Sequence, residues 1–359
     1  MLLPVNLENI LSNIKPIDRD VMGQAKERSN KLIMPLRAMG DLHDLAEQLC
    51  GITQSIAPKV KKRAVFLMVA DHGVVEENVS AYPQSITLAM VKAFVEGVAT
   101  ISVLSKTFKS KLIVADVGMK ENYSKKVIKN KDIIFVCEKI GRATKNFKTS
   151  KAMTYNEAIK SIETGFNIAN KYIKYYDLHL IATGDMGIGN TTAASAIASV
   201  ICDVPPEDIT GMGSQIDNDT LSRKIAVIKA AIAMHEPDKT NGIDVLSKVG
   251  GFEIGALAGV ILAGAYNRIP VVLDGAVTTS AALIAYSLKR YVKEYLISSH
   301  LSADRSHQFM LDHLQLKPLL NLQMRLGEGS GAVLAFPIIK AAAHIIKKVA
   351  TFKDLGLES

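Results

Sequence analysis

The sequence, 359 residues long, predicts an α/β protein whose parallel sheet carries helices on both faces. Six short apolar runs have the length and the β-branched residues of buried strands; they span residues 65–70, 112–116, 133–136, 178–182, 270–273 and 295–297. Helical patterns lie between most of them, at residues 86–104, 155–173, 220–234 and 275–288. This alternation of strands and helices is typical of a doubly wound sheet.

Polar residues and glycines stand at the ends of five of these runs. They are Asp71-His72-Gly73, Asp116-Val117-Gly118, Gly184-Asp185, Asp274-Gly275 and Ser299-His300. Ligands of open α/β sheets bind outside the carboxyl ends of the strands, so we expect these segments to meet at one edge. No zinc-ligand motif accompanies Asp71 and His72, and hydrogen bonding that shapes this edge is the favoured interpretation of both.

The most informative segment is Gly184-Asp185-Met186-Gly187-Ile188-Gly189-Asn190-Thr191-Thr192. It follows an apolar run and precedes a run of small residues, which predicts a strand, a glycine loop and a helix start. Glycines let the backbone approach a ligand, and a helix N-terminus attracts an anion such as phosphate. Asn190 stands where a P-loop has its lysine, and the G-x-G-x-x-G order of a dinucleotide site is absent. Two interpretations remain open, a monophosphate site and glycines that only permit tight strand-to-helix packing.

Composition narrows the class of protein. Apolar residues make up 48% of the chain, enough for a substantial core, and the three isolated cysteines predict neither a disulfide framework nor a zinc cluster, which suits the cytoplasm. The N-terminus lacks the features of a signal peptide. The most apolar stretches, 254–266 and 275–288, are shorter than the roughly 20 residues of a membrane span and are expected to be buried helices. The net charge of +8 comes with lysines in polar stretches and few aromatics, so nucleic-acid binding is disfavoured.

Both ends of the chain have helical periodicity and no convincing strand. We expect residues 1–55 and 331–359 to form a small helical domain, and residues 56–330 to form the large α/β domain. Helical segments are predicted at 41–49 and 332–342, where Pro337 is expected to kink or interrupt the helix.

Two further segments carry candidate functional side chains. Glu328 stands between glycines in Arg325-Leu326-Gly327-Glu328-Gly329-Ser330-Gly331. It is a candidate general base if burial raises its pKa, and the alternative is a carboxylate that interacts with the N-terminus of the following helix. Lys224 follows the glycine-rich segment Gly211-Met212-Gly213-Ser214. It is either a phosphate ligand or a lysine on a solvated face.

These segments together resemble the nicotinate-nucleotide–dimethylbenzimidazole phosphoribosyltransferase family, which makes the lower-ligand nucleotide of cobalamin. The matching segments follow the family's order along most of the chain. They are Ala70-Asp71-His72-Gly73-Val74, Val79-Ser80-Ala81-Tyr82-Pro83-Gln84, Gly184 to Thr192, Gly211-Met212-Gly213-Ser214, Arg223-Lys224-Ile225-Ala226, Val249-Gly250-Gly251-Phe252-Glu253-Ile254, Leu273-Asp274-Gly275, Ser299-His300 and Leu326-Gly327-Glu328-Gly329.

The resemblance implies a fold, an assembly and a reaction. The fold is a Rossmann-like six-stranded parallel sheet with flanking helices and a small helical domain built from both termini, and the assembly is a homodimer. The reaction transfers the phosphoribosyl group of nicotinate mononucleotide to 5,6-dimethylbenzimidazole, with inversion at the anomeric carbon, and gives α-ribazole 5′-phosphate and nicotinate. It calls for no metal and no cofactor.

The resemblance also assigns site residues. Glu328 is the general base, and Asp185 is a second catalytic carboxylate that stands where the family usually has glutamate. The segment from Gly187 to Thr192, with Lys224, is expected to hold the ribosyl phosphate. The substrate-binding residues are Ser80, Tyr82, Gln84, Met90, Met186, Gly187, Gly189, Asn190, Thr191, Thr192, Gly213, Lys224, Asp274, Ser299, Ser302 and Leu326.

Some alternatives stay open. Tyr82 and Met90, expected beside the aromatic base, have the character of ordinary core residues as well. The segment Ala303-Asp304-Arg305-Ser306-His307 departs from the family's usual A-E-x-G-H, so its contacts are not assigned. Two other functions compete with the transferase: a non-catalytic carrier of an α-ribazole-type nucleotide or base, and a phosphoribosyltransferase for another purine, benzimidazole or phenolic acceptor.

Overall fold

The structure, a computed structural model, describes residues 6–124, 130–213 and 216–357. Within these residues one sheet has six strands in the order β3-β2-β1-β4-β5-β6, and every neighbouring pair is parallel. The strands are β1 (Arg63–Ala70), β2 (Lys111–Gly118), β3 (Ile133–Cys137), β4 (Leu180–Met186), β5 (Val271–Leu273) and β6 (Leu296–Ser298). This is the strand order of the Rossmann fold, and the order reverses between β1 and β4.

All six predicted strands are confirmed, and the largest difference is in β4. The run 178–182 was expected to be the strand, whereas β4 begins at Leu180 and continues to Met186. Leu178 still belongs to the preceding helix end, since its N–H donates to the carbonyl of Ile173. The strand extends because β1 pairs alongside it as far as Met186. Gly184 and Asp185 therefore lie in a strand rather than in a loop.

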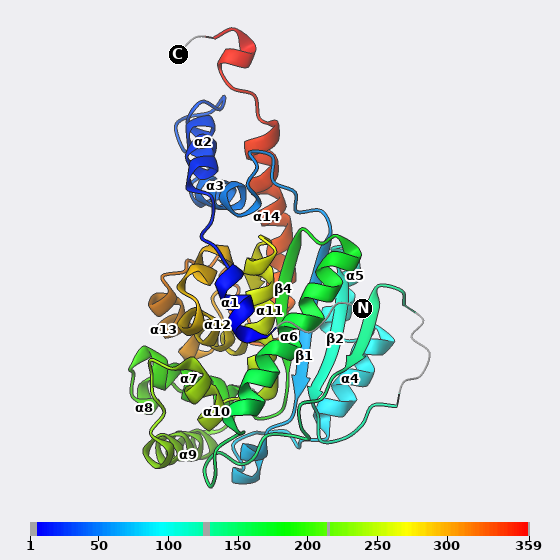
Figure 1. The fold of residues 1–359 in the computed structure, drawn as a ribbon, viewed down its shortest axis with the longest axis vertical. Coiled ribbons are helices and arrows are strands. Elements are labelled where there is room, and N and C mark those ends of the chain that lie inside the picture. The colour runs from blue at the N-terminus through cyan, green and yellow to red at the C-terminus, as the bar shows by residue number, and fades with distance from the viewer. Residues whose placement is uncertain (1–5, 125–129, 214–215, 358–359) are drawn as a thin grey trace.

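The sheet is covered on both faces, as doubly wound folds require (Figure 1). On one side of β1, Phe66 and Met68 join a core with α6 (Tyr155–Tyr176), α10 (Gly242–Val249), α11 (Phe252–Tyr266) and α12 (Ala276–Leu288). On the other side, Val65 and Leu67 join a core with α4 (Ile86–Glu96), α5 (Thr100–Thr107) and α14 (Ser330–Lys348). Alternate strand residues point to opposite faces, so both faces of β1 are apolar.

The predicted helix over 86–104 is wrong as one element. It is two helices, α4 and α5, because Gly97 ends α4 in the left-handed region at φ 84°. The break gives α5 an N-terminus of its own inside the protein. The other three helices predicted between the strands are confirmed with small shifts, as α6, α9 (Asn218–His235) and α12.

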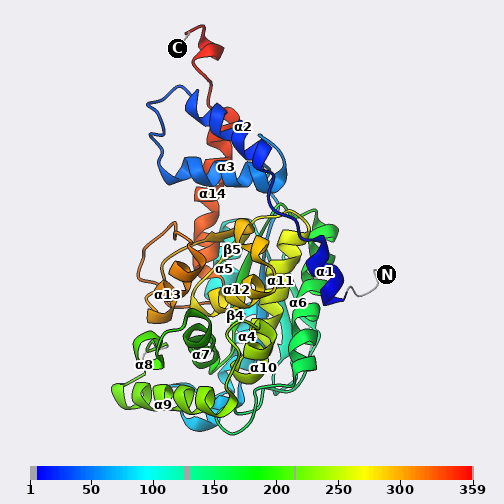
Figure 2. The same ribbon diagram turned by 60° about the vertical axis from the view of Figure 1, so that its left-hand side comes forward.

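Helices from the first fifty residues and from the C-terminal part of the chain form the narrow end of the molecule (Figures 1 and 2). There α2 (Arg19–Asn30) and α3 (Asp41–Thr53) pack against the last helix, α14. By contrast, α1 (Leu7–Asn13) lies against α6 and α11 of the sheet-containing part. The domain boundaries at 55 and 331 stay a prediction. Pro337 does not interrupt α14, which continues through it.

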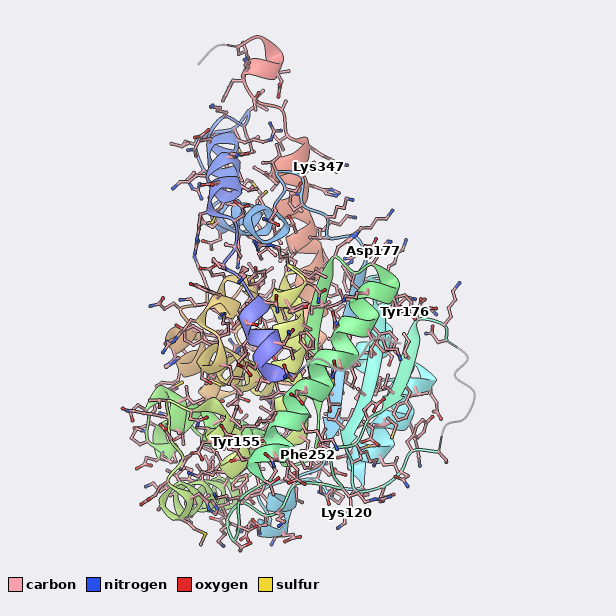
Figure 3. The ribbon with its side chains drawn as sticks, in the orientation of Figure 1. Lys120, Tyr155, Tyr176, Asp177, Phe252 and Lys347 are labelled. Atoms are coloured by element: carbon pink, nitrogen blue, oxygen red, sulfur yellow. The ribbon has the colours of Figure 1, made fainter. Side chains whose placement is uncertain are left out.

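The two ends of the sheet differ in what they carry. Figure 3 shows Lys120, which follows β2, at the same end as Tyr155 and Phe252, which begin α6 and α11. Tyr176 and Asp177 lie at the opposite end, with Lys347 beyond them. The carboxyl ends of the strands thus face away from the narrow end.

The remaining helices are η1 (Gly73–Glu77), α7 (Asn190–Cys202), α8 (Pro206–Ile209), η2 (Arg290–Tyr295), α13 (Arg305–Leu314) and η3 (Lys353–Leu355).

Two apolar stretches, Ile86–Thr107 and Ser330–Lys348, have the length and mean hydropathy of membrane-crossing helices by composition alone. Neither is a clear membrane span, because Gly97 divides the first into α4 and α5 and the second contributes Phe336 and Ile339 to the core. The stretches expected to be buried helices, now α11 and α12, are buried along nearly their whole length.

Candidate active site

A cavity of about 520 Å³ lies at the carboxyl end of β4, where the strand order reverses. The end of β4 and the start of α7 line part of it. The rest of the lining comes from the segment before and at the start of α4, the segment before and within α9, and the loops after β5 and β6. Residues 325–328 complete the wall. The predicted meeting of polar segments at one edge is confirmed for Gly184-Asp185, Asp274-Gly275 and Ser299-His300, each of which supplies at least one lining residue.

The predicted order of strand, glycine loop and helix is confirmed. After β4, Gly187 and Gly189 form the turn, and α7 begins at Asn190. Gly189 is the N-cap with φ 94°, a conformation that favours glycine. The first turn of α7 therefore borders the cavity with the positive end of the helix dipole.

Glu328 lies directly against this segment. A methyl group on Gly184 would sit 2.5 Å from the carbonyl oxygen of Glu328 and 2.8 Å from its carbonyl carbon. Because Gly184 has no side chain, the backbone of β4 can touch the backbone of the Glu328 loop, which lies far away in the sequence. Tight packing is therefore one reason for the glycine at position 184.

The Glu328 side chain is buried beside the cavity, with 5% of its surface exposed. Its carboxylate Oε2 accepts a hydrogen bond from the N–H of Ile101, in the first turn of α5, at 3.3 Å. Burial raises the pKa of Glu328, and the hydrogen bond from Ile101 opposes the rise. The alternative interpretation expected the carboxylate to interact with the following helix, α14, whereas the hydrogen bond described for it comes from α5.

Asp185 is the second carboxyl group in the cavity wall. It is 7% exposed, and its Oδ2 accepts a hydrogen bond from Nδ2 of Asn190 at 2.8 Å. Burial raises the pKa of Asp185 well above its usual range, and the neighbouring carboxylates of Asp274 and Glu253 add to the effect. The hydrogen bond from Asn190 opposes this rise.

Lys224 is buried, so its assignment to a solvated face is wrong. Only 1% of its surface is exposed, and its Nζ donates to Oγ1 of Thr191 at 3.1 Å and to the carbonyl of Gly211 at 3.2 Å. Burial lowers the pKa of Lys224 to about 8, although Asp304 opposes this. An ammonium has three N–H donors, so these two acceptors leave one for an anion in the cavity.

Apolar side chains form the outer part of the cavity. Tyr82 and Leu326 line it with about half of their surface still exposed, at 50% and 51%, and Met90 is half-buried. Tyr82 is therefore not a core residue. The predicted residues that line the cavity are Ser80, Tyr82, Met90, Asp185, Met186, Gly187, Gly189, Asn190, Thr191, Gly213, Lys224, Ser302, Leu326 and Glu328. Ser214 of the Gly211 segment lies outside the described residues.

Four predicted substrate-binding residues do not line the cavity. The Gln84 amide donates to the carbonyl of His72 at 3.0 Å, and Thr192 is fully buried in α7. The Ser299 hydroxyl donates to the carbonyl of Asp274 at 3.3 Å. The carboxylate of Asp274 accepts from backbone N–H groups at the start of α14. Burial raises the pKa of Asp274 to about 7 against the effect of those hydrogen bonds.

Several lining residues were not predicted. His300 is one of them, with its Nδ1 at 3.0 Å from the Ser299 hydroxyl and its pKa lowered to about 4 by burial. Its position after a predicted strand placed it at the ligand edge, but no contact with substrate was assigned to it. Ile188, within the segment expected to hold the phosphate, also lines the cavity, and the lining residues to which no substrate contact was assigned are Val79, Ile86, Met212, Ile216, Gly275, Ala276, Val277, His300, Asp304, Arg325 and Gly327.

Behind the glycine turn lies a buried pair, His72 and Glu253, with Nε2 and Oε1 2.6 Å apart. A methyl group on Gly189 would lie 3.2 Å from the Cβ of His72, so the His72 side chain packs closely against the glycine turn. Asp71 accepts a hydrogen bond from the N–H of Lys120 at 2.9 Å. Over the described ranges of the chain, no group of three or more His, Cys, Asp or Glu residues is arranged to hold a metal ion.

Fold and cavity define the class of protein: a Rossmann-type α/β protein with a small-molecule cavity at its topological switch point. A family described as "Phosphoribosyltransferase" matches residues 14–357. The nicotinate-nucleotide–dimethylbenzimidazole phosphoribosyltransferase of Alkaliphilus metalliredigens is 44% identical over 351 residues, which cover 98% of this chain and 99% of the relative. The protein of the same name from Clostridium acetobutylicum is 41% identical over 354 residues, 99% of this chain and 98% of the relative.

A solved structure agrees with these relatives. The crystal structure of the nicotinate-nucleotide–dimethylbenzimidazole phosphoribosyltransferase from Thermus thermophilus superposes with a TM-score of 0.89. It is 36% identical, and the superposition covers 96% of this chain and all of the other. The chain belongs to the nicotinate-nucleotide–dimethylbenzimidazole phosphoribosyltransferase family.

Proposed function

We propose that this protein transfers the 5-phosphoribosyl group of nicotinate mononucleotide to 5,6-dimethylbenzimidazole, a step in assembling the nucleotide loop of cobalamin. The products are α-ribazole 5′-phosphate and nicotinate. The observation that carries the proposal is the buried Glu328 carboxylate on the wall of a cavity that also contains a buried lysine, in a chain of this family.

The chemistry needs one base and no acid. The bond between C1′ and the pyridinium nitrogen breaks, and its electron pair neutralises the positive charge on that nitrogen, so nicotinate departs without a proton. One benzimidazole nitrogen forms the new bond to C1′, and the other nitrogen loses its proton. We assign Glu328 as the acceptor of that proton, since burial brings its pKa toward the working pH.

We assign the ribosyl phosphate to the inner part of the cavity. Lys224 and the first turn of α7, with Asn190 and Thr191, border it there. A charged N–H donor and a helix N-terminus are the groups that bind phosphate in many α/β proteins. The fit is electrostatic as well as geometric, because the one buried ammonium described in the cavity wall stands at the positive end of the α7 dipole.

We assign the aromatic base to the outer part, between Tyr82, Met90 and Leu326. These side chains offer a flat or flexible apolar surface, which suits an uncharged bicyclic ring. Ser80 supplies a hydroxyl beside them. The assembly as a homodimer and the location in the cytoplasm belong to this proposal as well, by analogy with soluble biosynthetic relatives.

The purified protein tests the proposal directly. It is incubated with nicotinate mononucleotide and 5,6-dimethylbenzimidazole, and nicotinate and α-ribazole 5′-phosphate are separated and quantified. We expect the two products in equal amounts. Tight binding of the base without either product would favour the carrier instead. Faster turnover with another purine, benzimidazole or phenol in a competition assay would favour a different acceptor.

A further inference from the structure

The loop that carries Glu328 has little local structure to hold it. Residues 321–327 form neither helix nor strand. Three successive residues, Gly327, Glu328 and Gly329, lie in the left-handed region at φ 84°, 64° and 90°. That conformation is costly for Glu328, which has a side chain, so the surrounding structure must impose it.

Asp274 imposes it from the end of β5. Its Oδ2 accepts from the N–H of Gly329 at 3.0 Å. Its Oδ1 accepts from the N–H of Gly331 at 2.7 Å and of Ala332 at 3.1 Å. A single carboxylate therefore fixes the residue after Glu328 and the first turn of α14, whose peptide N–H groups have no partner within the helix.

Asp274 is itself fixed to three elements. It follows β5 directly, its N–H donates to Oγ1 of Thr278 in α12 at 3.0 Å, and its carbonyl accepts from the hydroxyl of Ser299, after β6. The residue is fully buried and does not line the cavity. Both carboxylate oxygens already have backbone donors, so Asp274 has neither the access nor the spare geometry of a substrate ligand.

We infer that Asp274 is the positioning residue of the active site, which transmits the fixed position of the sheet to the Glu328 carboxylate through the backbone of residues 329–332. This inference rests on the proposed function, because it assigns Asp274 a role only through Glu328. Asp274 touches neither substrate nor reacting atom. Its loss leaves Glu328 present and misplaces it.

The test is a double-mutant cycle on the full-length protein. Asp274→Asn keeps the size of the side chain but places an NH₂ donor where one of the backbone N–H groups needs an acceptor. With Glu328 present, Asp274→Asn is expected to lower kcat by about 100-fold, the scale of an ångström-sized misplacement. In the Glu328→Gln background the same change is expected to lower kcat by less than about threefold, because the two residues act as one unit.

Binding and folding are measured on the same proteins. The Kd for nicotinate mononucleotide is expected to stay within about twofold in Asp274→Asn, since Lys224 and the first turn of α7, to which we assign the phosphate, make no contact with Asp274 in the hydrogen bonds described. Asp18→Asn is the matched control: Asp18 caps α2 by accepting from the N–H of Val21 at 3.0 Å, at the far end of the molecule. It is expected to leave kcat unchanged, because asparagine caps as well as aspartate.

Thr278→Val is a second variant, in case Asp274→Asn does not fold. It removes the acceptor of the Asp274 N–H and is expected to give a smaller loss of kcat with the same dependence on Glu328. An equal loss from either variant in both backgrounds, or no loss in the presence of Glu328, would overturn the inference. Failure of the proposed function is a separate result, since the wild-type protein would then form no nicotinate.

Discussion

Two glycine-containing loops build the cavity, and they are held in different ways. The loop at 187–189 continues β4 and enters α7, so its position follows from the strand and helix on either side. The loop at 327–329 enters α14 but follows residues without regular structure, and its position depends on Asp274 and on contact with Gly184. The half of the site that we propose binds the phosphate is thus built into the fold, whereas the half that we propose accepts the proton is attached to it by tertiary contacts.

Because the two loops are held differently, substitutions in each loop should have different effects. A change in the first loop or in Lys224 should weaken binding of the nucleotide and leave the Glu328 carboxylate in its position. A change in the second loop should alter the rate of the chemical step and leave binding in place. Each of the following experiments separates these two outcomes.

The largest effect is expected at Glu328. Glu328→Gln removes the proton acceptor and keeps its shape, so kcat should fall by about 10²- to 10⁴-fold with little change in nucleotide Kd. Asp185→Asn is the matched carboxyl-to-amide control in the same wall. Since burial disfavours the charged form of Asp185, its loss of kcat should stay below about tenfold, under about 1.4 kcal/mol. Similar losses from both variants would remove the distinction between the two carboxyl groups.

The next effect is expected at Lys224. Lys224→Met removes the buried ammonium and should weaken binding of nicotinate mononucleotide by about 10- to 100-fold, the scale of one charged hydrogen bond. Calorimetric titration measures this directly. The control is Lys229→Met on the same helix, whose Nζ forms an exposed ion pair with Glu207 and should not affect binding. A Lys224 variant with normal affinity and slow turnover would place the phosphate elsewhere.

A third effect is expected at the contact between the loops. Gly184→Ala places a methyl group against the Glu328 backbone, which cannot rotate away, so stability should fall by about 1–3 kcal/mol. Because the Glu328 loop is the more easily displaced of the two, kcat should fall by about tenfold or more. Gly23→Ala in α2, where a methyl group meets nothing within 4 Å, should be neutral or stabilising by up to about 1 kcal/mol. Unfolding curves and turnover of both variants are compared.

The smallest effect is expected from pH. Bound phosphate favours protonated Lys224, whose pKa in the free protein is about 8, so nucleotide affinity should fall as the pH rises past that value. The expected loss between pH 7 and 9 is about fivefold to tenfold. In the opposite direction, kcat/KM should fall as the pH drops through the raised pKa of Glu328 in the free protein, since the base must be deprotonated. In Lys224→Met, nucleotide affinity should no longer fall between pH 7 and 9. If it still falls, the titration of a group other than Lys224 causes the loss.

The structure of the first loop could be predicted from the local sequence better than that of the second. Six apolar runs and the segment from Gly184 to Thr192 were enough to predict the sheet, the turn and the start of α7, because these follow from local pattern. The local sequence made Glu328 a candidate general base, and the resemblance to a known family supplied its role and about half of the cavity wall. The break at Gly97 was missed, since apolar periodicity continues across it and only the left-handed φ ends the helix.

Tertiary hydrogen bonds account for the rest of what the sequence did not predict. Asp274 and Ser299 were expected to contact substrate, and nothing in their local sequence says that backbone groups some 55 residues later, such as the N–H of Gly329, occupy Asp274 instead. The burial of Lys224 is of the same kind. Its partners, Thr191 and Gly211, come from other segments, and an isolated lysine in a sequence does not show that it has them.

The role of Glu328 as the proton acceptor is tested most directly with a series of benzimidazoles whose N–H groups become progressively more acidic. The quantity measured is the ratio of kcat for the wild-type protein to kcat for Glu328→Gln with each acceptor. A base at position 328 predicts that this ratio falls steadily toward one, because an acidic azole loses its proton without help. A ratio that stays constant across the series would contradict that role.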